Sequence, residues 1–258
     1  MNLIVLLKMV PDIVEELGVA EDGKSLDASF LRMILNERDE HALEEALLLK
    51  ERHGGTVSVL ALDAPEIDDV LFTSLAKGAD RAVKLTDFGT SASTCGSAGA
   101  FSQCLATQSS LGPADLILTG VQAMDDLDGL TAPLVSHRLG LPYLGLVTQV
   151  VANPSARTAS VIKEFAGGVR GEFEVPLPAV LGIQAAEKPP RYVPVAKVRA
   201  VMKSQKIQCL SASASAEPVL SEVRQLAKAQ VAGHAEMLEG TPEEIAEKVC
   251  GLLAARGL

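Results

Sequence analysis

Aromatic side chains are scarce in this sequence of 258 residues: Phe, Trp and Tyr together make up 3%, and tryptophan is absent. Hydrophobic residues nevertheless account for 48% of the chain. We therefore expect a core built from Ala, Val, Leu and Ile, a composition typical of parallel sheets covered by helices. The length is sufficient for one large domain or two modest ones.

Long apolar runs and blocks of positive charge are also missing. No apolar stretch approaches the roughly 18 residues needed to span a bilayer. The run LIVLL at 3–7 has neither the basic start nor the small-residue cleavage site of a signal peptide. The net charge is −10, and no Lys/Arg-rich block is long enough to follow a phosphate backbone. We therefore expect neither direct membrane insertion nor nucleic acid as a partner.

Cysteine and histidine are few and dispersed, with no CxxC pair and no histidine at ligand spacing. We interpret the four cysteines as free thiols in a reducing cytoplasm rather than as a disulfide or zinc site: Cys95, Cys104, Cys209 and Cys250. No histidine is tied to the Ser and Cys residues of the Gly-rich stretch 89–99, so no nucleophile–base pair can be assembled. The sequence contains no catalytic machinery of its own, and any redox chemistry would be supplied by a cofactor.

What the chain does contain is an alternation of short apolar runs and amphipathic stretches. Strands are predicted at 3–7, 56–62, 81–85 and 114–120, and helices at 36–53, 66–75 and 129–140, with a further helix ending near 109. The first of these helices has Asn36 as its expected cap and Asp39 in the acidic position of a capping box. A long loop with a hairpin around 21–23 precedes it. The alternation predicts right-handed βαβ units on a mostly parallel sheet with helices on both faces.

The rhythm changes after about residue 145, where the strand-like runs 146–152, 158–165 and 172–183 predict antiparallel edge strands added to the sheet. The proline-containing, basic stretch 187–207 is interpreted as an exposed arm and 211–218 as a linker. A terminal helix is predicted with Thr241 as its cap and Glu244 as the capping-box acid. We therefore divide the chain into an α/β domain, 1–186, and a second part, 187–258, made of the arm, the linker and the C-terminal helix.

The stretch TGVQAMDDLDGLTAP, 119–133, places three aspartates between a predicted strand and a predicted helix. A calcium loop centred on Gly129 fails, because Met124 and Val135 occupy the positions where carboxylates are required. Amides at the helix start, with Gly129 and the Thr131 hydroxyl, are typical of an anion site. From the local sequence alone, an ordinary capped surface turn is the favoured alternative. Neither GxGxxG after a strand nor GxxxxGK[ST] is present.

Eight motifs occur in the order and spacing of the electron transfer flavoprotein β subunit, which the chain resembles from residue 1 to about 207 and more weakly beyond. They are IVLLKMVPD, LNERDEHALEEALLLKE, AKGADRAV, ADLILTGVQAMDDLDGLTAP, LGLPY, VPLPAVLGI, PPRY and EGTPEEIAEKV. The resemblance implies an adenine-nucleotide α-hydrolase-like fold and a soluble carrier that takes electrons from a flavin dehydrogenase. It also implies AMP in this chain, or a second FAD in electron-bifurcating relatives, and an α subunit that holds the redox FAD.

The resemblance carries the family's functional positions over residue by residue. The nucleotide-binding positions become Leu6, Asn36, Glu37, Arg38, Asp39, Asp63, Gly120, Gln122, Ala123, Asp125, Asp128, Gly129, Leu130 and Thr131. Ile13 is placed near the FAD of the α subunit. The dehydrogenase-docking segment has Val195 as its anchor and includes Arg191, Tyr192, Pro194, Lys197 and Arg199. Departures from the family pattern at Glu37, Val121 and Leu130 leave AMP and FAD both open.

Two functions of other classes remain compatible with the sequence. A stand-alone ATP-binding or stress-type domain has the same fold class, and a structural scaffold with an empty pocket needs no ligand at all. The dehydrogenase, the acceptor and the pathway are not encoded in any pattern found here.

Overall fold

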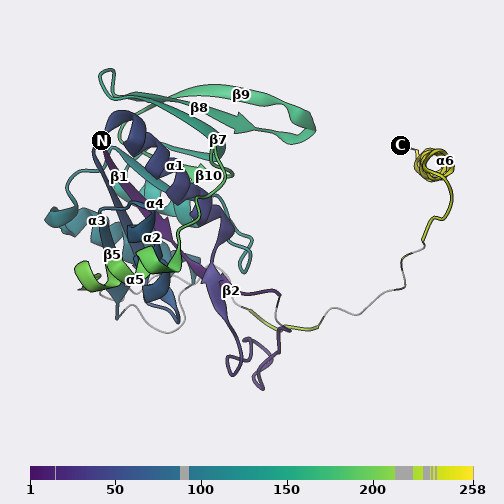
Figure 1. Cartoon of the computed structure of the whole chain (residues 1–258), viewed down its shortest axis with the longest axis horizontal. Coiled ribbons are helices and arrows are strands. Elements are labelled where there is room, and N and C mark those ends of the chain that lie inside the picture. Colours follow the sequence, from purple (N-terminus) through teal and green to yellow (C-terminus); the bar gives the residue numbers. More distant parts are fainter. Residues whose placement is uncertain are drawn as a thin grey trace.

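The computed structural model describes residues 1–14, 16–87, 93–212, 223–228, 233, 235 and 237–257. Within this part of the chain, a nine-stranded sheet has the order β11-β5-β4-β1-β6-β10-β7-β8-β9 (Figure 1). Its strands are β1 (Asn2–Leu7), β4 (Thr56–Leu62), β5 (Arg81–Thr86), β6 (Leu116–Gly120), β7 (Tyr143–Asn153), β8 (Thr158–Glu164), β9 (Arg170–Pro176), β10 (Ala179–Ile183) and β11 (Gln208–Ser211).

Helices cover both faces of this sheet. They are α1 (Glu37–His53), α2 (Ile67–Lys77), α3 (Thr94–Thr107), α4 (Thr131–Leu139) and α5 (Val195–Ser204), with α6 (Pro242–Ala254) near the C-terminus and short 3₁₀ turns at Ser109–Leu111 and Ala166–Gly168. A small antiparallel pair, β2 (Met9–Pro11) and β3 (Met33–Leu35), brackets the long loop. The hairpin predicted within that loop is confirmed by a bridge between Val19 and Leu26.

The buried side chains alternate along β1, as a strand covered on both faces requires. Leu3 and Val5 belong to one apolar cluster with α1 and α2 residues such as Leu43, whereas Ile4 belongs to a second cluster with α3 and α4 residues such as Phe101. Two layers of helix therefore sandwich the sheet. The predicted fold class, a mostly parallel α/β sheet with helices on both faces, is confirmed.

The antiparallel edge predicted after about residue 145 is confirmed for β7, β8 and β9. The prediction that the whole run 172–183 belongs to the antiparallel edge was wrong. The run divides into β9 at the sheet edge and β10, which lies between β6 and β7 and is parallel to both. The reason lies in the two compositions: AVLGI of β10 is buried throughout, whereas β9 carries charged, exposed positions that suit an edge.

The predicted exposed arm at 187–207 contains a helix that the sequence reading missed. Helix α5 packs against α2, and β11 then pairs in parallel with β5 and extends the same sheet. Of the predicted linker, 211–218, Ser211 ends β11, and residues 213–218 lie outside the described residues. Helix α6 lies well apart from the sheet in Figure 1, and its predicted capping box between Thr241 and Glu244 is confirmed.

The capping box predicted for α1 was wrong. Asn36 occupies the N-cap position, but its side chain makes no capping hydrogen bond, and Asp39 uses its carboxylate elsewhere. The side chains of Asn36 and Asp39 instead form hydrogen bonds with residues at the ends of β1 and β6, as described below. Among the described residues, no helix combines the length and apolarity needed to cross a bilayer.

Truncating a side chain between α1 and the sheet should show how much this packing contributes to the free energy of unfolding. Leu43 is 1% exposed between α1 and the sheet, so Leu43→Ala should destabilise the protein by about 2–5 kcal/mol. Leu252→Ala in α6 is the matched control, because Leu252 is 52% exposed and should change stability by less than about 0.5 kcal/mol. Urea unfolding measures both, and equal effects would contradict the proposed core.

Candidate functional site

A cleft opens at the carboxyl-terminal edge of the sheet, between the ends of β1 and β6. From β1 the chain proceeds to β4 and β5 on one side, with α1 and α2 on one face, and then crosses to β6 on the other side of β1. The strand order therefore reverses between β1 and β6. In open α/β sheets, ligands bind outside the carboxyl ends of the strands at such a reversal. Residues 6–8 and 119–123 line this cleft.

The carboxylate of Asp39, from the first turn of α1, connects the two strand ends. It accepts hydrogen bonds from the backbone amide of Lys8 at 2.8 Å and from the amide of Gly120 at 2.7 Å. A Cβ at Gly120 would come within 2.6 Å of the Asp39 carboxylate, so the close approach requires glycine. The side chain of Asn36 donates to the Gln122 carbonyl at 3.1 Å and ties the following loop to the same helix.

Asp39 is 4% exposed, and this burial dominates its ionisation. Burial raises the pKa of the Asp39 carboxyl to about 7, although hydrogen bonds from the Gly120 and Lys8 amides and from the Asn36 side chain lower it. Near neutral pH the group therefore sits between its charged and neutral forms.

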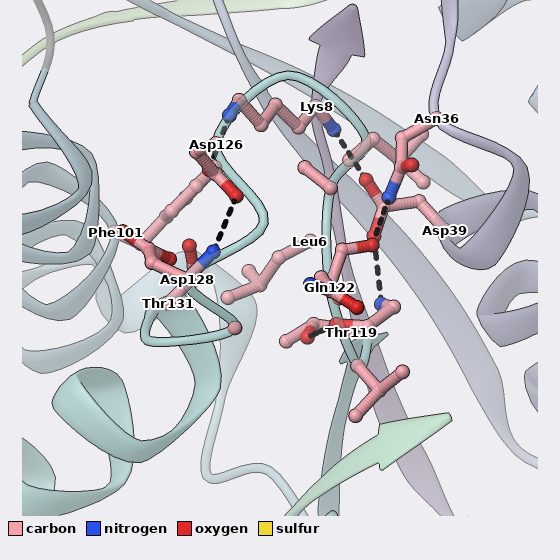
Figure 2. Close-up of a pocket in the computed structure, with 15 residues that line it drawn as sticks. Leu6, Lys8, Asn36, Asp39, Phe101, Thr119, Gln122, Asp126, Asp128 and Thr131 are labelled. Atoms are coloured by element: carbon pink, nitrogen blue, oxygen red, sulfur yellow. Dashed lines mark hydrogen bonds and ion pairs between the residues drawn. The ribbon is translucent and has the colours of Figure 1, made fainter. Parts of the chain in front are cut away.

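Lys8 reaches across the cleft to the aspartates of the loop after β6. Its ammonium contacts Asp125 at 2.7 Å and Asp126 at 2.6 Å. Burial lowers the pKa of Lys8, but hydrogen bonds to both aspartates and attraction by their charges outweigh it, so the pKa lies above its ordinary value. In Figure 2, Asp126, Asp128 and Thr131 lie on one side of the cavity, and Asn36 and Asp39 on the other.

Asp128 orders the start of α4. One of its oxygens accepts a hydrogen bond from the Leu130 amide at 2.9 Å, and the other accepts from the Thr94 hydroxyl at 2.6 Å, which joins the beginnings of α3 and α4. Gly129 has φ +61°, and a Cβ there would lie 3.1 Å from the Val121 carbonyl. The aspartates thus hold the loop through a lysine, an amide and a hydroxyl. Among the described residues, no cluster of acidic, His or Cys side chains could hold a metal.

The remaining wall of the cleft is apolar, because Leu6 of β1 and Phe101 of α3 face it. The space enclosed, part of it open to solvent, is about 360 Å³. The cleft therefore brings together an apolar wall, side-chain amides and the N-terminus of α4.

Most of the predicted nucleotide-binding residues meet in this cleft. Those that line it are Leu6, Asn36, Asp39, Gly120, Gln122, Ala123, Asp128, Gly129 and Thr131. Those outside its lining are Glu37, Arg38, Asp63, Asp125 and Leu130. The Arg38 guanidinium donates to the Gln184 carbonyl at 2.8 Å, and Asp63, after β4, lies 3.6 Å from the Lys84 ammonium.

Sequence reasoning missed Lys8, Phe101 and Asp126 as parts of the cleft. Lys8 directly follows the first predicted strand, 3–7, and was assigned no role. A cation directly after a buried strand, with an aspartate pair after another strand of the same sheet, was the available signal. Parallel strands place their carboxyl ends at one edge, so such groups meet there.

The two predicted partner-facing segments lie at the surface. Phe30 of the long loop is 94% exposed, and Ile13 and Val14 are also exposed. Val195, the first residue of α5, is 59% exposed. Exposed apolar side chains gathered on loops are typical of interaction surfaces.

An open α/β sheet with a ligand cleft at its strand-order reversal defines the doubly wound class of α/β proteins. Within that class, residues 27–217 match the model of the electron transfer flavoprotein domain, so the chain belongs to the electron transfer flavoprotein family. It is 30% identical over 262 residues to the electron transfer flavoprotein subunit beta of Methylophilus methylotrophus, covering 98% of each chain.

Two further relatives are similar to this chain. Identity is 32% over 265 residues to the electron transfer flavoprotein subunit beta of Bacillus subtilis (strain 168), covering 98% of this chain and 97% of the relative. It is 32% over 173 residues to Protein FixA of Azorhizobium caulinodans, covering 66% and 61%. The resemblance to β subunits drawn from the sequence motifs is confirmed, and the role of the family is electron transfer.

The raised pKa of Asp39 predicts a specific pH dependence of stability. Because the folded-state pKa, about 7, exceeds the ordinary value of 3.8, the stability contributed by this carboxyl is fully present below about pH 3.8 and is lost as the pH rises through 7. The difference in unfolding free energy between wild type and Asp39→Asn should therefore fall between pH 4 and 7, by up to about 4 kcal/mol, and then level off.

Urea unfolding at a series of pH values measures this difference, and the shared titrations of other groups cancel in it. Asp69→Asn, the same change at an exposed carboxylate of α2, is the control and should give a nearly flat difference. A flat difference for Asp39→Asn would show that burial does not raise this pKa.

Proposed function

We propose that this chain is the β subunit of a heterodimeric electron carrier that takes electrons from a flavin dehydrogenase. In this proposal it binds AMP in the cleft between β1 and β6 and pairs with an α subunit that holds the redox FAD. The observation that carries the proposal is the cleft itself, at the strand-order reversal and beside the N-terminus of α4. Similarity along nearly the whole length of named β subunits supports it. The four free cysteines agree with a cytoplasmic carrier.

The residues of the cleft suit a nucleoside monophosphate. Gly129 has no side chain to block the approach to the amides that begin α4, and the Thr131 hydroxyl lies beside them, so a phosphate is favoured there. Leu6 and Phe101 offer an apolar wall to a base, and the amides of Asn36 and Gln122 offer polar partners. FAD, bound mainly by the α subunit, would supply the redox chemistry, and this chain would hold the nucleotide and shape the interface.

The long loop between β2 and β3 is the proposed contact with the α subunit. Its apolar residues Ile13, Val14 and Phe30 have little of their own chain to cover them. The C-terminal segment lies against the same loop, since the Leu226 amide donates to the Gly23 carbonyl at 2.8 Å and Lys228 pairs with Glu16 at 2.6 Å. Burial of such a surface by a partner is favoured by the hydrophobic effect.

The segment 192–199 is the proposed contact with the dehydrogenase. Val195 offers a small apolar anchor, and Pro194 restricts the unbound conformations, which reduces the ordering cost of docking. Lys197 and Arg199 are exposed beside it, and such charges steer an acidic partner and raise the association rate more than the affinity.

Nucleotide binding is tested at Gly129, with a control at the other end of α4. Gly129 and Gly140 both have positive φ, so Ala substitution strains the backbone similarly at both positions, but a Cβ at Gly140 meets nothing within 4 Å. Gly129→Ala should lose most bound nucleotide and Gly140→Ala should keep it. Thr131→Ala should weaken binding by about 0.5–1.5 kcal/mol, the value of one hydrogen bond.

The measurement is chromatography of the small molecules released on denaturation, from the chain purified with its α partner. AMP without a second flavin supports the carrier, whereas two FAD per heterodimer would indicate the bifurcating alternative. Hydrolysis of ATP by the lone chain would indicate the stand-alone domain. Full nucleotide occupancy in Gly129→Ala contradicts the proposed phosphate position.

Docking is tested by placing a charge at the anchor. Val195→Asp should raise the KM for a purified flavin dehydrogenase by about tenfold or more, because the charge must lose water in an apolar contact. Direct reduction by dithionite needs no docking and should be unchanged. Val169→Asp, at a similarly exposed valine before β9, is the control, and a wild-type rate in Val195→Asp would remove this segment from the docking surface.

A further inference from the structure

Residues 184–191 connect β10 to the docking segment and run along α1; we call them the strap. Side chains of α1 hold the backbone of the strap at successive points. The Arg38 guanidinium donates to the Gln184 carbonyl at 2.8 Å, and the Glu187 amide donates to Glu45 at 3.0 Å. Between them, the Ala186 amide donates to Nδ1 of His41 at 3.2 Å. The strap is therefore bound to α1 by specific polar contacts.

The last residue of the strap, Arg191, makes the densest of these contacts. Its backbone amide donates to Glu44 at 3.0 Å, and its Nε and Nη2 atoms donate to the same carboxylate, Nη2 at 2.7 Å. Its Nη1 atom donates to Glu51 at 2.6 Å. The side chain of Glu44 is only 3% exposed, so this two-pronged ion pair is largely withdrawn from water. Paired guanidinium and carboxylate groups of this geometry fix orientation as well as distance.

The docking segment makes few polar contacts with the rest of the protein. Helix α5 contains no buried residue, and among the described residues its side chains make no hydrogen bond or ion pair with the rest of the protein. It packs on α2, and its partly buried Val201 contacts the core cluster. Tyr192, directly after Arg191, is 83% exposed. The point at which the segment leaves α1 is therefore set by the contacts of Arg191.

We propose that Arg191 and Glu44 position the dehydrogenase-docking segment, and that Arg191 does not itself contact the dehydrogenase. This inference rests on the proposed function. A guanidinium already bound by two carboxylates has few donors left for a partner, whereas Lys197 and Arg199 are exposed. Holding the chain at residue 191 reduces the conformations that Val195 explores before docking, and this preorganisation favours binding.

The rival explanation is that Arg191 contributes only positive charge, which attracts an acidic partner from a distance. The two explanations differ in their response to salt. Long-range steering is screened as ionic strength rises, because the Debye length falls to about 3 Å at 1 M. A positioning effect changes the shape of the unbound segment and persists in salt.

The experiment compares Arg191→Gln with Arg199→Gln in the heterodimer. Both variants remove one positive charge from the same region, but only the first removes the contacts with Glu44. Hydrogen exchange of the α5 amides should accelerate by roughly tenfold in Arg191→Gln and little in Arg199→Gln. The KM for a purified flavin dehydrogenase that reduces the wild-type complex should rise by about tenfold in Arg191→Gln, at low salt and at about 0.5 M, with kcat nearly unchanged.

A second variant keeps the test independent of folding. Arg191→Gln leaves Glu44 buried without its cation, which destabilises by itself, so Glu44→Gln/Arg191→Gln replaces the pair with neutral amides. The double variant should show the same faster exchange and raised KM. In Arg191→Lys, the exchange rate and KM should return only part of the way to their wild-type values.

Unchanged exchange and KM in both Arg191→Gln and the double variant overturn the inference. The inference is also overturned if the rise in KM of Arg191→Gln disappears at high salt. Any rise in KM of Arg199→Gln should disappear at high salt, because that residue acts through its charge. Failure of the proposed function is seen separately: a wild-type rate with Val195→Asp means that the segment does not dock the dehydrogenase, whatever the exchange of α5 shows.

Discussion

The carboxylate of Asp39 determines how this sheet ends. It accepts the amides of Lys8 and Gly120, the first residue after β1 and the last of β6, and so joins two strands that belong to opposite halves of the fold. Parallel strands leave such amides without partners where the ladder stops, and burying them unpaired is costly. One acidic side chain from the start of α1 satisfies both. The cleft exists because the strand ends are held here while their following loops diverge.

The charges of the loop 125–128 are paired in a way that is compatible with the proposed phosphate site beside it. The three aspartates of 125–128 do not face the start of α4 unpaired: two hold Lys8, and Asp128 holds the Leu130 amide and the Thr94 hydroxyl. In the proposed nucleotide site, the positive potential would come from the backbone amides at the N-terminus of α4. Such a site depends on the exact path of the loop, which explains the glycine at 129 with its positive φ.

Helix α1 serves two regions of the molecule. Asn36 and Asp39 at its start line the cleft, and Arg38 together with residues of the later turns holds the strap that leads to α5. Some of the charged residues of this helix are therefore buried rather than solvated. Glu44 and Glu45 are as buried as the leucines beside them, since their carboxylates accept amides of the strap.

The sequence by itself determined those features that depend on neighbouring residues. The 2.0 and 3.6 periodicities assigned the strands and helices of the βαβ units, and Thr241 with Glu244 began α6 as predicted. The loop 119–133 was placed between a strand end and a helix start for the same reason. Tertiary structure decided the rest. Lys8 forms an ion pair with Asp125, 117 residues away in the sequence. Asp39 accepts the Gly120 amide, 81 residues away, instead of forming the expected capping box. The insertion of β10 between β6 and β7 was likewise fixed by which surfaces remained to be buried. Local patterns report short-range backbone preferences, whereas these contacts arise only when distant segments pack and their polar groups must find partners away from water.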